Sequence, residues 1–234
     1  MKADEIFSWI ATILGFGLKS SPIVLFYKIA LGKETIEIVP EMLIICNVLC
    51  AELWFSYWTK KGDKLAPLVS SSVSLVLGII FSFVYLFYFS GKKCLKFLLY
   101  IFLEAIFVCL LFYGLSLTEV DIVGKIANVV NVITFISPGQ RIVRVCKEKN
   151  YKLIPIWTTV LGCISSFLWL CFGILIKDIN CIIPNAISVS LALFNTLVWL
   201  YFYCITKDEE KKDEKDNEVE MIETDKGDKE VNEV

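Results

Sequence analysis

The chain has 234 residues, of which 56% are hydrophobic and 14% aromatic, and its mean hydropathy is +0.67. Soluble domains are about 45–50% apolar, so this composition favours a membrane protein. The sequence contains no histidine, which excludes histidine-activated nucleophiles and histidine zinc sites. We therefore expect no enzyme activity, no metal and no other cofactor.

Charge is distributed unevenly along the chain. Residues 207–234 contain 6 basic and 13 acidic residues, whereas residues 1–206 contain 17 basic and 12 acidic residues. The formal net charge of −2 therefore combines an apolar, mildly basic body with a short acidic tail. Because the tail consists mostly of Lys, Asp and Glu, we expect it to be disordered and solvated.

Seven apolar stretches follow one another in the body. Each is close to or longer than the roughly 20 residues that a helix needs to cross the hydrocarbon core of a bilayer. The predicted spans are residues 6–30, 40–59, 65–91, 97–117, 122–143, 153–176 and 179–206. The connecting loops are too short to form a separate domain, so the expected fold class is an all-α membrane protein.

The positions of Lys and Arg indicate the orientation of the seven spans. The first, third and fifth connections, with the adjoining helix ends, carry ten basic residues, whereas the other connections carry five. By the positive-inside rule, the N-terminus is expected to be extracellular or lumenal and the C-terminus cytoplasmic. The plasma membrane is the expected location, with an internal membrane as the alternative.

The chain contains an internal repeat. Ser21-Pro22 recurs as Ser137-Pro138 after 116 residues, and Trp54 recurs as Trp169 after 115 residues. The other matched pairs, at offsets of 114–115, are Pro40 and Pro155, Asp63 and Asp178, and Tyr85 and Trp199. A steady offset over three helices indicates a duplicated three-helix unit.

This repeat defines the predicted domains. Residues 1–91 form a first three-helix bundle, residues 92–118 a single linker helix, residues 119–206 a second bundle and residues 207–234 the tail. Because the linker crosses the membrane once, both bundles enter from the same side and form parallel repeats. Secondary transporters with such repeats hold their substrate near the middle of the membrane, between the repeats.

The ordered residues of the two repeats resemble the SWEET family of sugar transporters over residues 10–203. The matching positions of the second repeat are Asn131, Ser137-Pro138, Pro155, Leu168-Trp169, Gly173 and Pro184-Asn185. Those of the first repeat are Ser21-Pro22, Pro40, Asn47, Leu53-Trp54 and Tyr57. The resemblance implies two three-helix bundles joined by one helix, and facilitative uniport of mono- or disaccharides by alternating access.

The same resemblance implies a substrate pocket between the repeats. The implied substrate-binding residues are Trp54, Ser71, Trp169, Asn185, Cys50 and Ser165. Ser71 departs from the family, which usually has Asn at that position. By helix rise, the two Trp residues, Ser71 and Asn185 lie at one depth, about 10–12 Å from the outer helix ends. Sugar C–H faces stack on aromatic rings while the hydroxyls need polar partners. The alternative is that the Trp side chains are packing residues and that Asn185 ties helices together.

Four prolines lie toward the predicted cytoplasmic ends of their helices. They are Pro22, Pro40, Pro138 and Pro155, and they resemble the SWEET prolines that act as hinges. A proline removes one helical hydrogen bond and weakens the helix locally. The alternative for Pro40 and Pro155 is that each merely starts its helix.

Three charged residues lie within the predicted spans, and such residues are costly in lipid. They are Lys19, Glu52 and Glu104. Because Lys19 and Glu52 have similar predicted depths, we expect them to form an ion pair that is either structural or coupled to transport. No partner is predicted for Glu104.

Two other functions remain open from the sequence. One is a proton-coupled transporter of the PQ-loop kind, which would move an amino acid or another small metabolite and would use Glu52 for the coupling. The segment Pro138-Gly139-Gln140 only half matches the Pro-Gln motif of such proteins. A non-transporting receptor or assembly subunit would lack uptake altogether. The expected partners are a sugar and the lipid bilayer, with no nucleic acid, and a homo-oligomer remains open.

Overall fold

The computed structural model describes residues 2–33, 41–88, 119–134 and 136–231, together with positions 95, 97–99, 101–103, 105–106, 109 and 113. The helices of the first repeat are α1 (Ala3–Lys19), α2 (Pro22–Ala30), α3 (Glu41–Lys61) and α4 (Leu65–Tyr88). Those of the second are α6 (Val120–Thr134), α7 (Ile136–Glu148), the 3-10 turn η2 (Tyr151–Leu153), α8 (Ile156–Leu175) and α9 (Ile179–Val231). Within the described residues, all regular structure is helical, as predicted.

Four described stretches are long and apolar enough to cross a bilayer. They are Ala3–Ala30, Leu65–Tyr88, Ile156–Leu175 and Ile179–Lys207. Large apolar side chains such as Ile13, Phe83 and Leu197 are more than 60% exposed on the outer surface. Exposed apolar surface of this kind suits contact with lipid tails rather than with water. Most of the predicted span 97–117, including Glu104, lies outside the described residues.

The first helix of the first repeat is divided in two. The α1 helix ends at Lys19 and α2 begins at Pro22, which has no N–H to donate to the carbonyl of Leu18. The amides of Ser21 and Ile23 instead make tighter bonds to the carbonyls of Leu18 and Ser20, at 3.1 and 3.0 Å. In the second repeat the corresponding segments are α6, which ends at Thr134, and α7, which begins at Ile136, and residue 135 between them lies outside the described residues. The predicted span 6–30 therefore contains a break.

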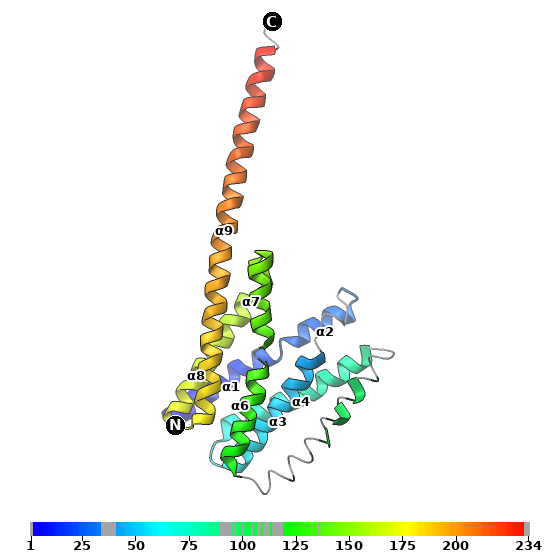
Figure 1. The fold of residues 1–234 in the computed structure, drawn as a ribbon, viewed down its shortest axis with the longest axis vertical. Helices are drawn as coiled ribbons and strands as arrows, with labels where there is room; N and C mark the ends of the chain where they lie inside the picture. Colours follow the sequence, from blue (N-terminus) through cyan, green and yellow to red (C-terminus); the bar gives the residue numbers. More distant parts are fainter. Residues whose placement is uncertain are drawn as a thin grey trace.

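The packing of the helices follows the repeat. The third helix of each bundle lies between the other two, since α4 packs against α1 and α3, and α9 packs against α6 and α8. Between bundles the contacts are reciprocal, because α1 packs against α8 and α6 packs against α3 (Figure 1). The first helix of each repeat thus contacts the second helix of the other, as a twofold axis between parallel repeats requires.

The two repeats meet in a core formed by both. Tyr57 and Trp58 from the first repeat pack with Val123, Phe172 and Cys181 from the second. The interface also depends on Gly124 of α6, because a Cβ there would lie 2.6 Å from the Asn180 side chain. Real Cβ atoms do not approach other atoms so closely, so the glycine allows α6 to reach the start of α9.

The acidic tail differs from the prediction of disorder. Helix α9 continues as one helix to Val231 and extends away from the bundles (Figure 1). Lys and Glu are strong helix formers, and opposite charges recur four residues apart, as in Asp208, Lys212 and Asp216. These local preferences favour a helix even where the composition is too polar to form a packed core.

Candidate substrate cavity between the repeats

A cavity of about 580 Å³ lies between the two repeats. Its walls come from α1, α3 and α4 of the first repeat and from α6, α8 and α9 of the second. The bend at Ser21 and Pro22 also lines it. This volume is within the range of about 300–1,000 Å³ typical of sites for small molecules.

Five of the six predicted substrate-binding residues line this cavity. They are Cys50, Trp54, Ser71, Trp169 and Asn185. The sixth, Ser165, does not line the cavity in this structure, and its role in substrate binding stays a prediction. The Ser165 hydroxyl donates to the Ala11 carbonyl at 3.5 Å and is buried between α8 and α1. Because α1 packs against this face of α8, Ser165 contacts a helix backbone instead of the cavity.

The two tryptophans are held by neighbouring aromatic rings. The Trp54 ring stacks on Trp58 with centroids 6.4 Å apart and meets Tyr57 edge-on at 5.5 Å. The Trp169 ring meets Phe172 edge-on, also at 5.5 Å. These contacts restrict the rotamers of both indoles, while each indole retains a surface on the cavity. The first repeat and the second repeat thus each supply one supported aromatic surface.

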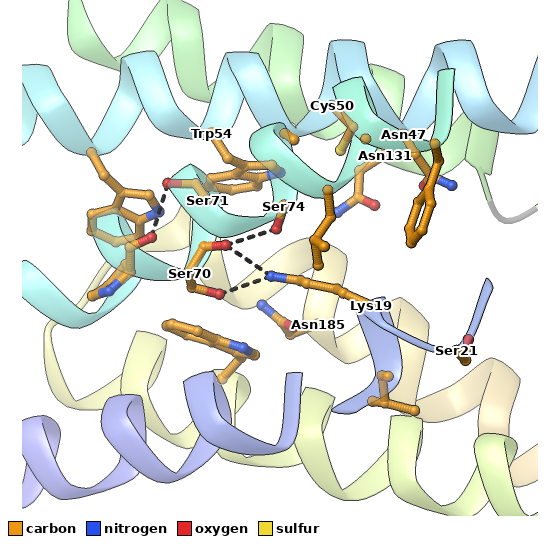
Figure 2. A pocket seen from close by; sticks show the side chains of 18 of the residues that line it. Lys19, Ser21, Asn47, Cys50, Trp54, Ser70, Ser71, Ser74, Asn131 and Asn185 are labelled. Carbon is orange, nitrogen blue, oxygen red and sulfur yellow. Dashed lines mark hydrogen bonds between the residues drawn. The ribbon is translucent and has the colours of Figure 1, made fainter. Parts of the chain in front are cut away.

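Polar side chains occupy the wall between the tryptophans. The Asn185 amide donates to the Cys181 carbonyl at 2.7 Å, and the Ser71 hydroxyl donates to the Pro67 carbonyl at 2.9 Å. The Ser74 hydroxyl also donates to its own helix backbone, at 2.7 Å from the Ser70 carbonyl. Figure 2 shows these side chains around the same space. The backbone carbonyls fix the polar groups in place and leave oxygen lone pairs for a ligand.

Several further polar residues line the cavity that were not predicted as site residues. They are Asn47, Asn131, Ser70 and Ser74. The family resemblance includes Asn47 and Asn131 without implying a role for them, and Ser70 to Ser72 form a run of three serines in an otherwise apolar span. Polar residues inside an apolar span are the signal that could have identified all four.

The predicted ion pair between Lys19 and Glu52 is wrong. The Lys19 ammonium enters the cavity and donates to the hydroxyl and carbonyl oxygens of Ser70, at 2.9 and 3.1 Å (Figure 2). Glu52 precedes Trp54 by two residues, which turns it about 200° around α3, away from the cavity. The half-buried Glu52 accordingly does not line the cavity.

A buried cluster at one end of the cavity joins the repeats. The Tyr57 hydroxyl donates to the Asp178 carboxylate at 2.8 Å, and the Lys61 ammonium forms an ion pair with the same oxygen. The other carboxylate oxygen accepts from the amides of Asn180 and Cys181 at 3.0 and 3.4 Å, at the start of α9. Asp178 is 5% exposed. We call Tyr57, Lys61 and Asp178 the end cluster.

A second ion pair at the same end lies within the first repeat. The Lys64 ammonium contacts the Asp4 carboxylate at 2.8 Å, and this ion pair connects the α3–α4 loop to the start of α1. The hydrogen bond to Asp4 raises the pKa of Lys64 above its usual value. This pair does not line the cavity.

The prolines predicted as hinges occupy different places. Pro22 lines the cavity at the break between α1 and α2, whereas Pro155 is the N-cap of α8. Pro138 lies in the first turn of α7, and Pro40 lies outside the described residues. The hinge role of these prolines stays a prediction, and Pro155 stands where a proline starts a helix.

Comparison with known proteins identifies the family. The family described as "Sugar efflux transporter for intercellular exchange" matches residues 5–93 and again residues 121–209. The chain belongs to this family. The two matched segments begin 116 residues apart and correspond to the two repeats. The family includes the SWEET proteins, so the resemblance seen in the sequence is confirmed.

Curated relatives are SWEET transporters from plants and an amoeba. The chain is 27% identical to bidirectional sugar transporter SWEET8 of Arabidopsis thaliana, over 93% of this chain and 94% of that protein. It is 25% identical to SWEET10 of the same plant, over 84% of this chain and 70% of that protein. It is also 25% identical to sugar transporter SWEET1 of Dictyostelium discoideum, over 74% of this chain and 83% of that protein.

A solved structure confirms the fold. The structure of a eukaryotic SWEET transporter at 3.7 Å resolution superposes with a TM-score of 0.78 at 17% sequence identity. It covers 87% of this chain and all of the other. The helical arrangement is therefore that of a SWEET transporter, and this membership places the chain among membrane transporters rather than enzymes.

Proposed function

We propose that this SWEET-family protein is a facilitative uniporter that carries mono- or disaccharides across a membrane by alternating access. The observation that carries the proposal is the cavity between the repeats, with Trp54 and Trp169 on its walls and Asn185 and Ser71 between them. The curated relatives are named as sugar transporters, which supports the same substrate class.

The cavity provides both the apolar surfaces and the hydrogen-bonding groups that match those of a sugar. The faces of Trp54 and Trp169 accept the C–H face of a pyranose ring, and burial of this apolar surface stabilises the complex. The Asn185 and Asn131 amides present both donors and acceptors to the hydroxyls. Because each hydroxyl loses water on entry, these polar partners offset the cost of desolvation.

Alternating access requires one end of the cavity to close while the other opens. In our proposal the end cluster closes the end near Asp178, because its contacts join α3 of one repeat to the start of α9 in the other. The cavity then continues toward Ser21, Asn47 and Asn131 at the opposite end. Release of the end cluster lets the repeats separate there, and the Pro22 break allows the first helix to bend.

The orientation follows from the loop charges. We place the end cluster on the extracellular or lumenal side, with the N-terminus there and the C-terminus in the cytoplasm, because Lys and Arg are in excess at the other end. The conformation described above is then open toward the cytoplasm. We propose the plasma membrane as the location, which surface biotinylation of intact cells tests directly.

Uniport is favoured over proton coupling by the position of the carboxylates. Glu52 lies off the cavity wall, and the described residues that line the cavity include no Asp or Glu. A substrate passing through this cavity therefore contacts no described carboxylate that could exchange a proton with it.

Counterflow in proteoliposomes tests the proposal. Purified protein is reconstituted with unlabelled glucose, fructose or sucrose inside, and entry of the labelled sugar is followed. We expect counterflow of at least one sugar without an imposed proton gradient, and its loss in Trp169→Ala and Asn185→Ala. Folded wild-type protein that moves none of these sugars contradicts the proposal.

A further inference from the structure

The substrate cavity carries a positive charge. Lys19 is the charged residue among the described residues that line the cavity. Its ammonium donates to the Ser70 hydroxyl at 2.9 Å and to the Ser70 carbonyl at 3.1 Å. Both acceptors are uncharged, so they satisfy hydrogen bonds of the ammonium without neutralising it.

No carboxylate balances this charge within the described part of the chain. Glu52 lies off the cavity wall, and Asp178 forms its ion pair with Lys61 at the closed end. An ammonium has three donors, and Ser70 accepts from two of them. The remaining donor is available to a ligand in the cavity, where Figure 2 shows the ammonium between Ser70 and Asn185.

The position of the ammonium is defined by its surroundings. The Lys19 side chain runs back along α1 over Gly15, where a Cβ would lie 3.9 Å from both Cε and Nζ. Helical side chains favour this direction toward the N-terminus. Because Ser70 binds the far end of the side chain, the ammonium is held at one point of the cavity wall, and Trp54 and Ser71 line the same cavity (Figure 2).

We propose that Lys19 makes this transporter prefer sugars that carry one negatively charged group over neutral sugars of the same size. The inference rests on the proposed function and specifies its substrate class. An unpaired charge in a largely apolar cavity is costly, and an anionic group on the sugar relieves that cost while accepting the free N–H. Hydrogen bonds between charged groups of this kind change affinity by roughly ten- to a hundredfold.

The first test uses the wild-type protein and pairs of ligands that differ in charge. Glucuronate and glucuronamide have nearly the same shape and the same hydroxyls, but only glucuronate is anionic. We expect glucuronate to compete with labelled glucose in counterflow at least about tenfold more strongly than glucuronamide does. Comparing competition by glucose 6-phosphate with competition by unlabelled glucose tests whether a sugar that carries a phosphate group is also bound. Equal or weaker competition by both anions overturns the proposal.

The second test assigns the preference to Lys19. In Lys19→Met the ratio of glucuronate to glucuronamide affinity should fall to about one, whereas Lys19→Arg should keep a preference for the anion. Lys64→Met removes a lysine that pairs with Asp4 outside the cavity, and it should keep the wild-type ratio. A Lys19→Met protein with the wild-type ratio overturns the assignment.

Failure of this inference and failure of the proposed function give different results. If folded wild-type protein shows no counterflow of glucose, fructose or sucrose, the proposed function fails, and calorimetric titration with glucuronate and glucuronamide still measures the charge preference. If glucose counterflow is present and the two ligands compete equally, only the inference fails.

Discussion

The end cluster should control which end of the cavity is open. Asp178 accepts hydrogen bonds from Tyr57, Lys61 and the amides of Asn180 and Cys181. Asp178→Asn keeps the size of the side chain and one carbonyl oxygen, which can still accept from the backbone amides. It removes the negative charge and replaces the oxygen that binds Tyr57 and Lys61 with an NH₂ group.

The size of the effect follows from the two lost contacts. Hydrogen bonds to a charged group contribute about 1.5–3 kcal/mol each. The Lys61 side chain is 27% exposed, so water replaces part of its lost contact, whereas the Asp178 side chain is 2% exposed. We therefore expect about 2 kcal/mol of net loss, which shifts the population away from the closed end by roughly thirtyfold.

Alkylation of Cys181 measures this shift. Cys181 lines the cavity, is 3% exposed and donates its amide to Asp178. In a protein that retains only this cysteine, a membrane-impermeant maleimide added outside should react slowly. We expect Asp178→Asn to accelerate the reaction at least about tenfold. Asp4→Asn is the matched control, because it removes a carboxylate at the same end whose ion pair lies within one repeat. Equal rates for wild type and Asp178→Asn would refute the role of the end cluster.

Three further substitutions probe the interface, the pocket and the break. Gly124→Ala should lower the thermal midpoint of unfolding by several degrees, because the added Cβ would lie 2.6 Å from the Asn180 side chain and overpacking costs about 1–3 kcal/mol. Gly17→Ala is the control, because a Cβ at Gly17 would have no atom within 4 Å. Ser71→Asn introduces the residue usual in SWEETs and should raise sugar affinity several-fold by one added hydrogen bond, measured by titration. Unchanged affinity would show that the side chain at this position does not contact the sugar. Pro22→Ala supplies the missing helical N–H and should slow sugar counterflow several-fold without weakening the equilibrium binding of the sugar. Counterflow as fast as that of the wild type would argue against a hinge at Pro22.

The internal repeat made the fold and much of the cavity wall predictable. Trp54 and Trp169 recur at a fixed offset, and a twofold arrangement places both on the same cavity. The depth of a residue in a helix can be counted along the sequence, which is why Ser71 and Asn185 also line this cavity.

The direction of a side chain around its helix was harder to predict. Lys19 and Glu52 were paired on depth alone, but Glu52 lies on another face of α3 from Trp54. Ser165 is one turn from Trp169, yet α1 covers it. Both differences from the expected positions have the same cause, because the face that a helix turns to the cavity depends on which helices pack beside it.

The end cluster was missed for a related reason. In the sequence Asp178 stands out only as the repeat of Asp63, and nothing in the linear sequence brings it to Tyr57, 121 residues away. A single carboxylate between two charge-free spans was the available signal. Pro22 is predicted as a weak point of its helix, although the residues at which α1 ends and α2 begins are not predicted from the sequence.

The central claim is that a sugar binds between the two repeats at the level of Trp54 and Trp169. Determining the structure with a transported sugar bound tests this claim most directly. We predict density for the sugar in contact with both indoles and within hydrogen-bond distance of Asn185. Sugar bound elsewhere on the protein, with this cavity empty at saturating concentration, would contradict the account.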